Sequence, residues 1–256
     1  MVTKAKNLVY TSKEVRDSIE EFEKSLKKKN HRYRSFDFCY HYFQTNQKDL
    51  TANMETSCMV LWSYLTSWGM LRNSKLLQKN YSVLKPVIKA IQTIFNEGNG
   101  NHNIEKDKDK YCKKVVNLYN GIYQSLPKYL NASETLVTKI ILGVFGAFPA
   151  LDQYFRKTFG YSEIETIAGR VWEFYRQHQP YYNVINTFKI PVKSFNVQPT
   201  GLYYPVAKLI DMFGFTYGMG KSNQPKHAKK LRGSALKKHN KSVNYEKVKG
   251  KKEVEC

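Results

Sequence analysis

Arg34 and His41 are the two side chains in this sequence whose types and spacing could together perform catalysis. Seven positions correspond to about two helical turns, so on a helix both side chains would lie on the same face. An imidazole could take a proton from a ribose 2′-hydroxyl or give one to the leaving oxygen, while a guanidinium stabilises the phosphorane charge. Such a pair could cleave RNA without a metal ion. The alternative is that the surrounding tyrosines and phenylalanines make His41 a packed core residue.

The spacing of these two residues resembles the Arg-x4–6-His motif of the HEPN ribonuclease superfamily. Members of that superfamily are small helical bundles and often dimeric toxins. The resemblance therefore implies an all-α fold, metal-independent RNA cleavage and a possible homodimer. Those families usually place a polar residue directly after the arginine, and Ser35 is compatible with that pattern. The resemblance covers only residues 34–41.

A basic segment, residues 24–34, lies immediately ahead of this aromatic stretch. In a nucleic-acid-binding protein the cations would follow the phosphates while an aromatic ring stacks on a base. The residues expected to make these contacts are Lys27, Lys28, Lys29, Arg32 and Tyr33. The alternative is a helix C-terminus, where lysines complement the helix dipole and face water.

The chain has a formal net charge of +21, and its C-terminal segment is especially basic. Residues 221–256 hold twelve Lys/Arg and three Asp/Glu, so the body keeps a net charge of +12 without them. Such an excess predicts a polyanionic partner, most simply RNA or DNA, because basic side chains release counterions from a phosphate backbone. The tail residues expected to contact phosphates are Lys229, Lys230, Arg232, Lys237 and Lys238. The alternative is a tail that only promotes solubility or binds any polyanion.

Other chemistries have no recognisable residue pattern in the sequence. The four cysteines are far apart and no paired histidines have metal-ligand spacing, so we expect no metal site and no disulfide framework. The segment 214–221 contains G-x-G-K but lacks the full phosphate-loop spacing, and no strand precedes it. We therefore expect no cofactor.

The elements that must position these residues are helical by their periodicity. Apolar residues recur at three and four positions in successive stripes from Val15 to Phe95, with a capping-box pattern at Thr11 and Glu14. Together these helical stripes predict an all-α fold, with a single domain of about eight helices over residues 1–220. The basic tail, residues 221–256, is predicted to be disordered because it has few apolar residues.

Several boundaries follow from local signals. Residues 76–95 continue the helical pattern, with Pro86 either kinking the helix or occupying its first turn. Asp152 after Pro149 is typical of a helix start. The stretch 187–205 has three prolines and no helical period, which predicts an extended surface loop over residues 181–203. The last helix should run from Pro205 to Phe213 and end near Gly214.

Three segments resemble a family of uncharacterised bacterial all-helical proteins: residues 61–72, 142–155 and 204–213. That resemblance implies no particular activity. No signal peptide or membrane-spanning stretch is evident, and the predicted location is the cytoplasm.

The sequence thus predicts a non-catalytic or regulatory nucleic-acid-binding protein without membrane contact. The first alternative is the metal-independent ribonuclease that uses Arg34 and His41. The second is a protein-interaction module of a bacterial defence or toxin system.

Overall fold

The computed structural model describes residues 9–28, 30–72, 74–98, 100, 104–176 and 184–223. The chain divides into two compact units, Met1–Gly218 and Met219–Cys256. The predicted tail lies outside the described residues except for its first three positions. The predicted all-α class is confirmed, but the helix count is about ten rather than about eight.

The α-helices described here are α1 (Ser12–Leu26), α2 (Ser35–Thr45), α3 (Met54–Ser67), α4 (Lys85–Asn96), α5 (Lys108–Ser125), α6 (Glu134–Phe145), α7 (Gln153–Phe159), α8 (Ile164–Arg176) and α10 (Val206–Asn223). Four short 3-10 helices are η1 (Arg32–Arg34), η2 (Lys75–Gln78), η3 (Tyr81–Leu84) and η4 (Lys128–Leu130). A hairpin of two strands, β1 (Pro191–Lys193) and β2 (Pro199–Tyr203), completes the described elements.

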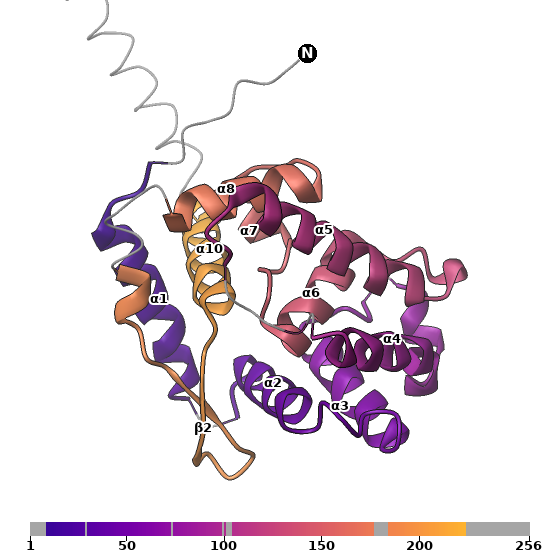
Figure 1. Ribbon diagram of the computed structural model, residues 1–256. Helices are drawn as coiled ribbons and strands as arrows, with labels where there is room; N and C mark the ends of the chain where they lie inside the picture. Colours follow the sequence, from indigo (N-terminus) through magenta and orange to yellow (C-terminus); the bar gives the residue numbers. More distant parts are fainter. Residues whose placement is uncertain are drawn as a thin grey trace, which may run out of the picture. The chain divides into compact units, whose positions relative to one another are not determined.

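Helix α6 forms the centre of the core. Every residue from Leu136 to Phe145 is buried, and all of them except Thr138 and Lys139 are apolar. Helices α2, α3 and α5 pack against it (Figure 1). Gly143 makes the contact with α3 possible, because a Cβ there would lie 2.4 Å from the Tyr64 ring.

Two predicted helix starts are confirmed. The hydroxyl of Thr11 accepts a hydrogen bond from the Glu14 amide, and the Glu14 carboxylate accepts one from the Thr11 amide. The carboxylate of Asp152 accepts from the amides of Tyr154 and Phe155 at the start of α7. Both side chains satisfy amides that the helix itself leaves without partners.

The predicted helical pattern over residues 76–95 is α-helical only from Lys85 onward. Two 3-10 turns, η2 and η3, precede α4, and the side chains of Ser74 and Asn80 cap them by accepting from Leu76 and Ser82 amides. Polar caps at six-residue spacing divide the helical pattern into separate turns. Pro86 occupies the first turn of α4, which is one of its two predicted roles.

The segment predicted as an extended loop is a β-hairpin in its second half. Strand β1 pairs with β2 in antiparallel register, with Pro191 opposite Tyr203. Val192 is fully buried, which anchors the hairpin to the body, while Phe195 at the turn is 84% exposed. Val197, at the same turn, has a backbone φ of 64°, a conformation that β-branched residues rarely adopt.

The predicted end of the last helix at Gly214 is also wrong, because α10 continues to Asn223. A Cβ at Gly214 would lie 2.4 Å from the Phe155 ring, and one at Gly218 would lie 2.0 Å from the Tyr154 carbonyl oxygen. These glycines therefore allow α10 to approach α7 closely. Among the described residues, none of the helices has the length and apolarity needed to span a membrane.

Candidate nucleic-acid interface

Arg34 is held in contacts that stabilise the fold. Its guanidinium donates a hydrogen bond of 2.6 Å to the carbonyl of Leu26, the last residue of α1. The same group lies 3.5 Å from the carboxylate of Asp37, which is 1% exposed. Asp37 also accepts from the Tyr204 hydroxyl and the Lys193 amide. Arg34 thus joins α1 and α2 to the hairpin region.

His41 lies on α2, two turns from Arg34, and its ring is half-buried. The ring makes no hydrogen bond to any residue that the structure describes. The recorded contacts of the Arg34 guanidinium are with Leu26 and Asp37, and among the described residues no hydrogen bond joins it to His41.

Tyr33 has no ring face available for a base. The Phe22 ring stacks on it at a centroid distance of 4.3 Å, and the Trp68 ring stacks on it at 5.2 Å. Its ring is 8% exposed, so it is a core residue. Arg32 lies over both Tyr33 and Trp68 and donates to the Ser67 carbonyl, although its side chain remains exposed.

Among the other predicted contact residues, Lys27 and Lys28 are exposed at the end of α1. The rest lie outside the described residues: Lys29, Lys229, Lys230, Arg232, Lys237 and Lys238. Their proposed contacts with phosphates stay predictions.

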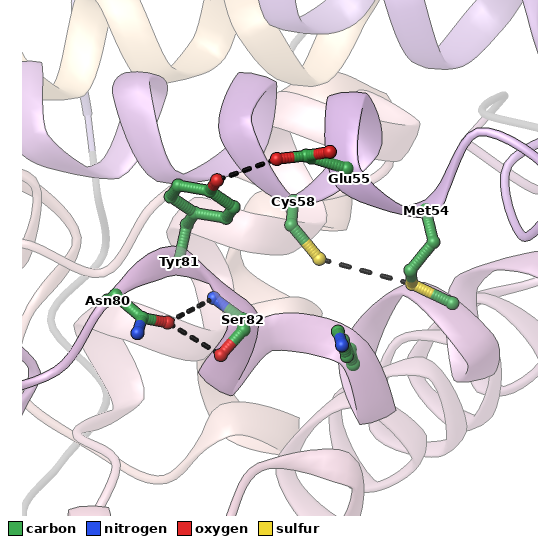
Figure 2. Close-up of a pocket in the computed structure, with 7 residues that line it drawn as sticks. Met54, Glu55, Cys58, Asn80, Tyr81 and Ser82 are labelled. Atoms are coloured by element: carbon green, nitrogen blue, oxygen red, sulfur yellow. Dashed lines mark hydrogen bonds between the residues drawn. The ribbon is translucent and has the colours of Figure 1, made fainter.

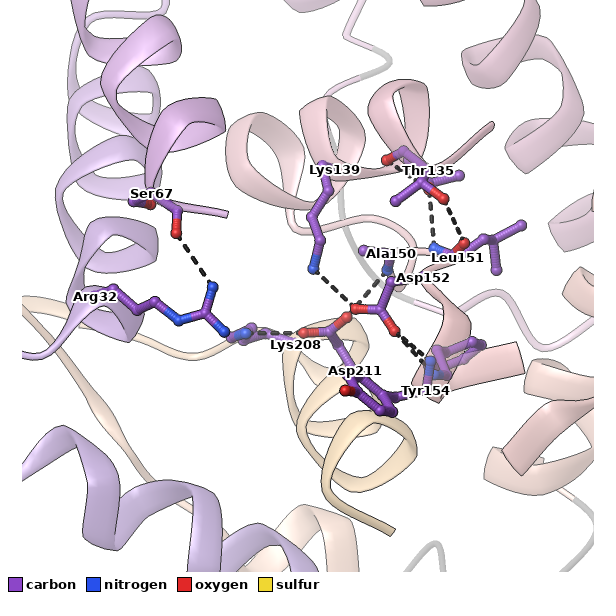
Figure 3. Close-up of polar contacts among 12 residues, drawn as sticks. Arg32, Ser67, Thr135, Lys139, Ala150, Leu151, Asp152, Tyr154, Lys208 and Asp211 are labelled. Atoms are coloured by element: carbon purple, nitrogen blue, oxygen red, sulfur yellow. Dashed lines mark hydrogen bonds and ion pairs between the residues drawn. The ribbon is translucent and has the colours of Figure 1, made fainter. Parts of the chain in front are cut away.

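A buried cluster of charged side chains, formed by Lys139, Asp152, Lys208 and Asp211, joins several elements of the core (Figure 3). Lys208 on α10 donates to Asp211 at 2.9 Å, and both side chains are 1% exposed. Lys139 on α6 lies 3.4 Å from Asp152, and its ammonium is 4.1 Å from the centroid of Trp68. Asp211 also accepts from the Ala150 amide. The cluster therefore ties α10 to α6 and to the segment that begins α7.

Lys139 and Lys208 each lie over the ring of Trp68 as well as beside a carboxylate. Burial lowers the pKa of Lys208, and the nearby Asp211 carboxylate acts against that effect. Burial alone would raise the pKa of Asp211, but Lys208 and Lys139 bring it below its usual value. Within the pair, each side chain offsets the charge of the other in the core.

A second set of cations lies on the surface and has no acidic partners. We call it the basic face and define it as Arg72, Lys75, Lys79 and Lys128. All four side chains are exposed, and none forms an ion pair with any residue in the described ranges. By contrast, the exposed Lys13 and Lys24 pair with Asp17 and Glu21 on α1.

Contacts across the surface show that the basic face is continuous. A pocket of about 350 Å³ is lined by Arg72, Lys75 and residues 130–133. A neighbouring pocket of about 350 Å³ shares Ala132 and is lined by Lys128 and Tyr123. The Lys79 ammonium lies 5.3 Å from the ring centroid of Tyr129, which is 52% exposed. Neither pocket has an acidic residue among those that line it.

The short 3-10 turns position these cations. Leu76 and Leu130 are buried, at 1% and 6% exposure, and anchor η2 and η4 to the core. Their polar neighbours must then face water, because a short turn has only one buried face. The interruption of the predicted helix over residues 76–95 therefore helps to create the basic face.

The sequence carries a signal for this face that charge runs alone do not reveal. Between Glu55 and Glu97 there is no acidic residue, but there are five basic ones. Each cation is isolated, so no cluster is evident by inspection. The absence of acids over 41 positions is the informative pattern.

Within the described ranges, no three His, Cys, Asp or Glu side chains gather in a group that could hold a metal ion. Comparisons of the chain with protein-family models, curated proteins and solved structures found no match. The resemblance of its three segments to a bacterial family therefore stays a prediction.

Proposed function

We propose that this protein binds nucleic acid without cleaving it, and that the basic face is the contact surface of its folded body. The observation that carries this proposal is a continuous surface with four exposed cations that have no acidic partner among the described residues. Unpaired cations attract a polyanion more strongly than cations whose charge is already compensated. The partner that best matches this arrangement is a phosphate backbone.

Exposed aromatic rings lie beside these cations. Tyr123 is 46% exposed and Tyr129 is 52% exposed. Rings of this kind can stack on unpaired bases, and such stacking contributes about 1–3 kcal/mol for each base. A surface that combines cations with exposed tyrosines suits single-stranded or looped nucleic acid better than a continuous duplex.

The segments predicted from the sequence would assist this surface. Lys27 and Lys28 are exposed and can contact a backbone that passes near the end of α1. The basic tail adds sequence-independent attraction and a faster encounter rate. The body supplies the defined surface, and the tail supplies affinity.

Catalysis by Arg34 and His41 would require Arg34 to give up contacts within the fold. For the guanidinium to stabilise a phosphorane it would have to leave both Leu26 and the buried Asp37. That exchange would leave a buried carboxylate without its cation, at a cost of several kcal/mol.

The test uses two triple variants of the full chain with equal changes in charge. One is Lys75→Gln, Lys79→Gln and Lys128→Gln; the control is Lys13→Gln, Lys24→Gln and Lys48→Gln. Binding of a single-stranded RNA is measured over a range of salt concentrations, and the RNA is then analysed for cleavage.

The basic-face variant should reduce the slope of log K against log salt by about 2 to 3, because each lost phosphate contact removes about 0.7 to 0.9. The control variant should change the slope by less than about 1. Equal slopes for both variants would refute the assignment of the surface, and cut RNA would refute the non-catalytic role.

A further inference from the structure

A pocket of about 500 Å³ opens between α3 and η3, directly after Lys79 in the chain. Its volume is within the range of small-molecule sites, about 300–1,000 Å³. Its lining residues include Met54, Glu55, Cys58, Asn80, Tyr81 and Lys85 (Figure 2). The pocket is separate from the basic face but adjoins it through the Lys79–Asn80 connection.

The pocket has an apolar, polarisable floor. The thiol of Cys58 and the thioether of Met54 are one helical turn apart on α3, with their sulfur atoms 4.0 Å apart. Sulfur atoms pack well against flat aromatic rings. Cys58 is 1% exposed, so it forms the base of the pocket rather than a reactive surface thiol.

Two opposite charges line the pocket without neutralising one another. The carboxylate of Glu55 accepts a hydrogen bond of 2.8 Å from the Tyr81 hydroxyl, which fixes its direction. The ammonium of Lys85 forms no ion pair with any residue that the structure describes, including Glu55. The carboxylate can accept further hydrogen bonds, and the ammonium can donate three.

The remaining wall is rigid. The side-chain oxygen of Asn80 accepts from the Ser82 amide at 2.9 Å and from the Ser82 hydroxyl at 2.6 Å. These contacts use the Asn80 oxygen and hold the η3 turn in place, while the Asn80 amide nitrogen is a further donor. The charged groups that line the pocket are Glu55 and Lys85.

We infer that this pocket binds a purine nucleotide, with guanine preferred over adenine. The flat base would lie on the sulfur floor, and the phosphate would pair with Lys85. Guanine has two N–H donors side by side on its Watson–Crick edge, and a carboxylate can accept both. Adenine offers a donor beside an acceptor, so it would make one hydrogen bond to Glu55 and face one repulsive contact.

This inference rests on the proposed function for the source of the ligand. If the chain binds RNA at the basic face, an unpaired guanosine of the same strand could enter the pocket next to Lys79. A free guanosine monophosphate would satisfy the same groups. The chemistry is shared, and the two sources are distinguished by experiment.

The first experiment measures binding of guanosine monophosphate and adenosine monophosphate to the full chain by calorimetry. The wild type should prefer the guanine nucleotide by at least about tenfold, since one bidentate contact supplies discrimination of that order. Glu55→Gln should abolish the preference, and Lys85→Gln should weaken both nucleotides alike. Both side chains are exposed, so neither variant should lower the melting temperature. No saturable binding, or an unchanged preference in Glu55→Gln, would overturn the inference.

The second experiment compares two oligonucleotides, one with a single unpaired guanine in a loop and one with adenine at that position. If the strand supplies the ligand, the guanine loop should bind at least about tenfold more tightly, and Glu55→Gln should remove the difference. If a free nucleotide is the ligand, the two loops should bind equally while guanosine monophosphate still binds. Binding of the nucleotide with no binding of either oligonucleotide would refute the proposed function and leave the pocket assignment standing. Equal binding of both loops with no nucleotide binding would refute the pocket alone.

Discussion

Replacing Lys208 by methionine removes one charge from the centre of the protein and keeps most of the side-chain volume. The ammonium lies 2.9 Å from Asp211, and both side chains are 1% exposed. After the substitution, the Asp211 carboxylate keeps the Ala150 amide as its one hydrogen-bond donor within the described ranges, with Lys139 as a more distant charge.

Loss of one member of a buried ion pair costs about 3–5 kcal/mol, because the remaining charge is buried without its partner. Lys139 still acts on Asp211, so we expect the lower end of this range, about 3 kcal/mol. A protein of this size loses about 2–4 °C in melting temperature per kcal/mol, which gives a decrease of roughly 6–12 °C.

Urea unfolding and thermal melts of four proteins test this expectation: wild type, Lys208→Met, the double variant Lys208→Met with Asp211→Leu, and the exposed control Lys48→Met. The double variant should recover most of the loss, because an apolar pair of similar volume can replace a buried ion pair at little cost. The control should lie within about 0.5 kcal/mol of wild type. A loss below about 1 kcal/mol in Lys208→Met, or a double variant less stable than the single one, would refute the reasoning.

Three further predictions concern other parts of the fold. Gly218→Ala should lower the free energy of unfolding by about 2 kcal/mol or more, because its Cβ would meet the Tyr154 carbonyl. Gly220→Ala, where a Cβ meets nothing, should stabilise α10 by about 0.5–1 kcal/mol. Equal melting temperatures for the two variants would contradict the close packing of α10 on α7. Val197→Gly should raise the free energy of unfolding by up to about 1 kcal/mol by relieving the positive φ, and a loss of stability in urea would count against strain at this turn. Burial raises the pKa of Asp37 to about 6, which means that the folded state favours the protonated carboxyl. The resulting contribution to the free energy of unfolding is complete below about pH 4 and is lost as the pH rises through about 6. Relative to Asp37→Asn, the wild type should lose up to about 3 kcal/mol between pH 4 and pH 7, and parallel stability profiles for the two proteins would contradict this.

The sequence predicts the fold where one local signal dominates. The stripe from Val15 to Leu26 and the capping box at Thr11 are both present in the structure, as is the cap at Asp152. Prediction fails where tertiary contacts override local propensity. Gly214 and Gly218 are typical of a helix end, but their small size is used for packing on α7 within a longer helix.

The candidate site is harder to predict because it depends on what each side chain contacts. Arg34 and Tyr33 have residue types suited to nucleic-acid chemistry, but their groups are used inside the fold. The cations of the basic face are isolated in the sequence, and only the fold brings Lys79 to the ring of Tyr129. The buried pair of Lys208 and Asp211 shows no sequence signal beyond the spacing of three residues.

Lysine footprinting of the full chain tests the central claim most directly. The lysines are acetylated with and without a single-stranded RNA, and modification is read at each residue by mass spectrometry. The basic-face account predicts that Lys75, Lys79 and Lys128 become protected while Lys13 and Lys24 do not. Protection confined to residues 221–256 would contradict it, because the folded body would then have no part in binding.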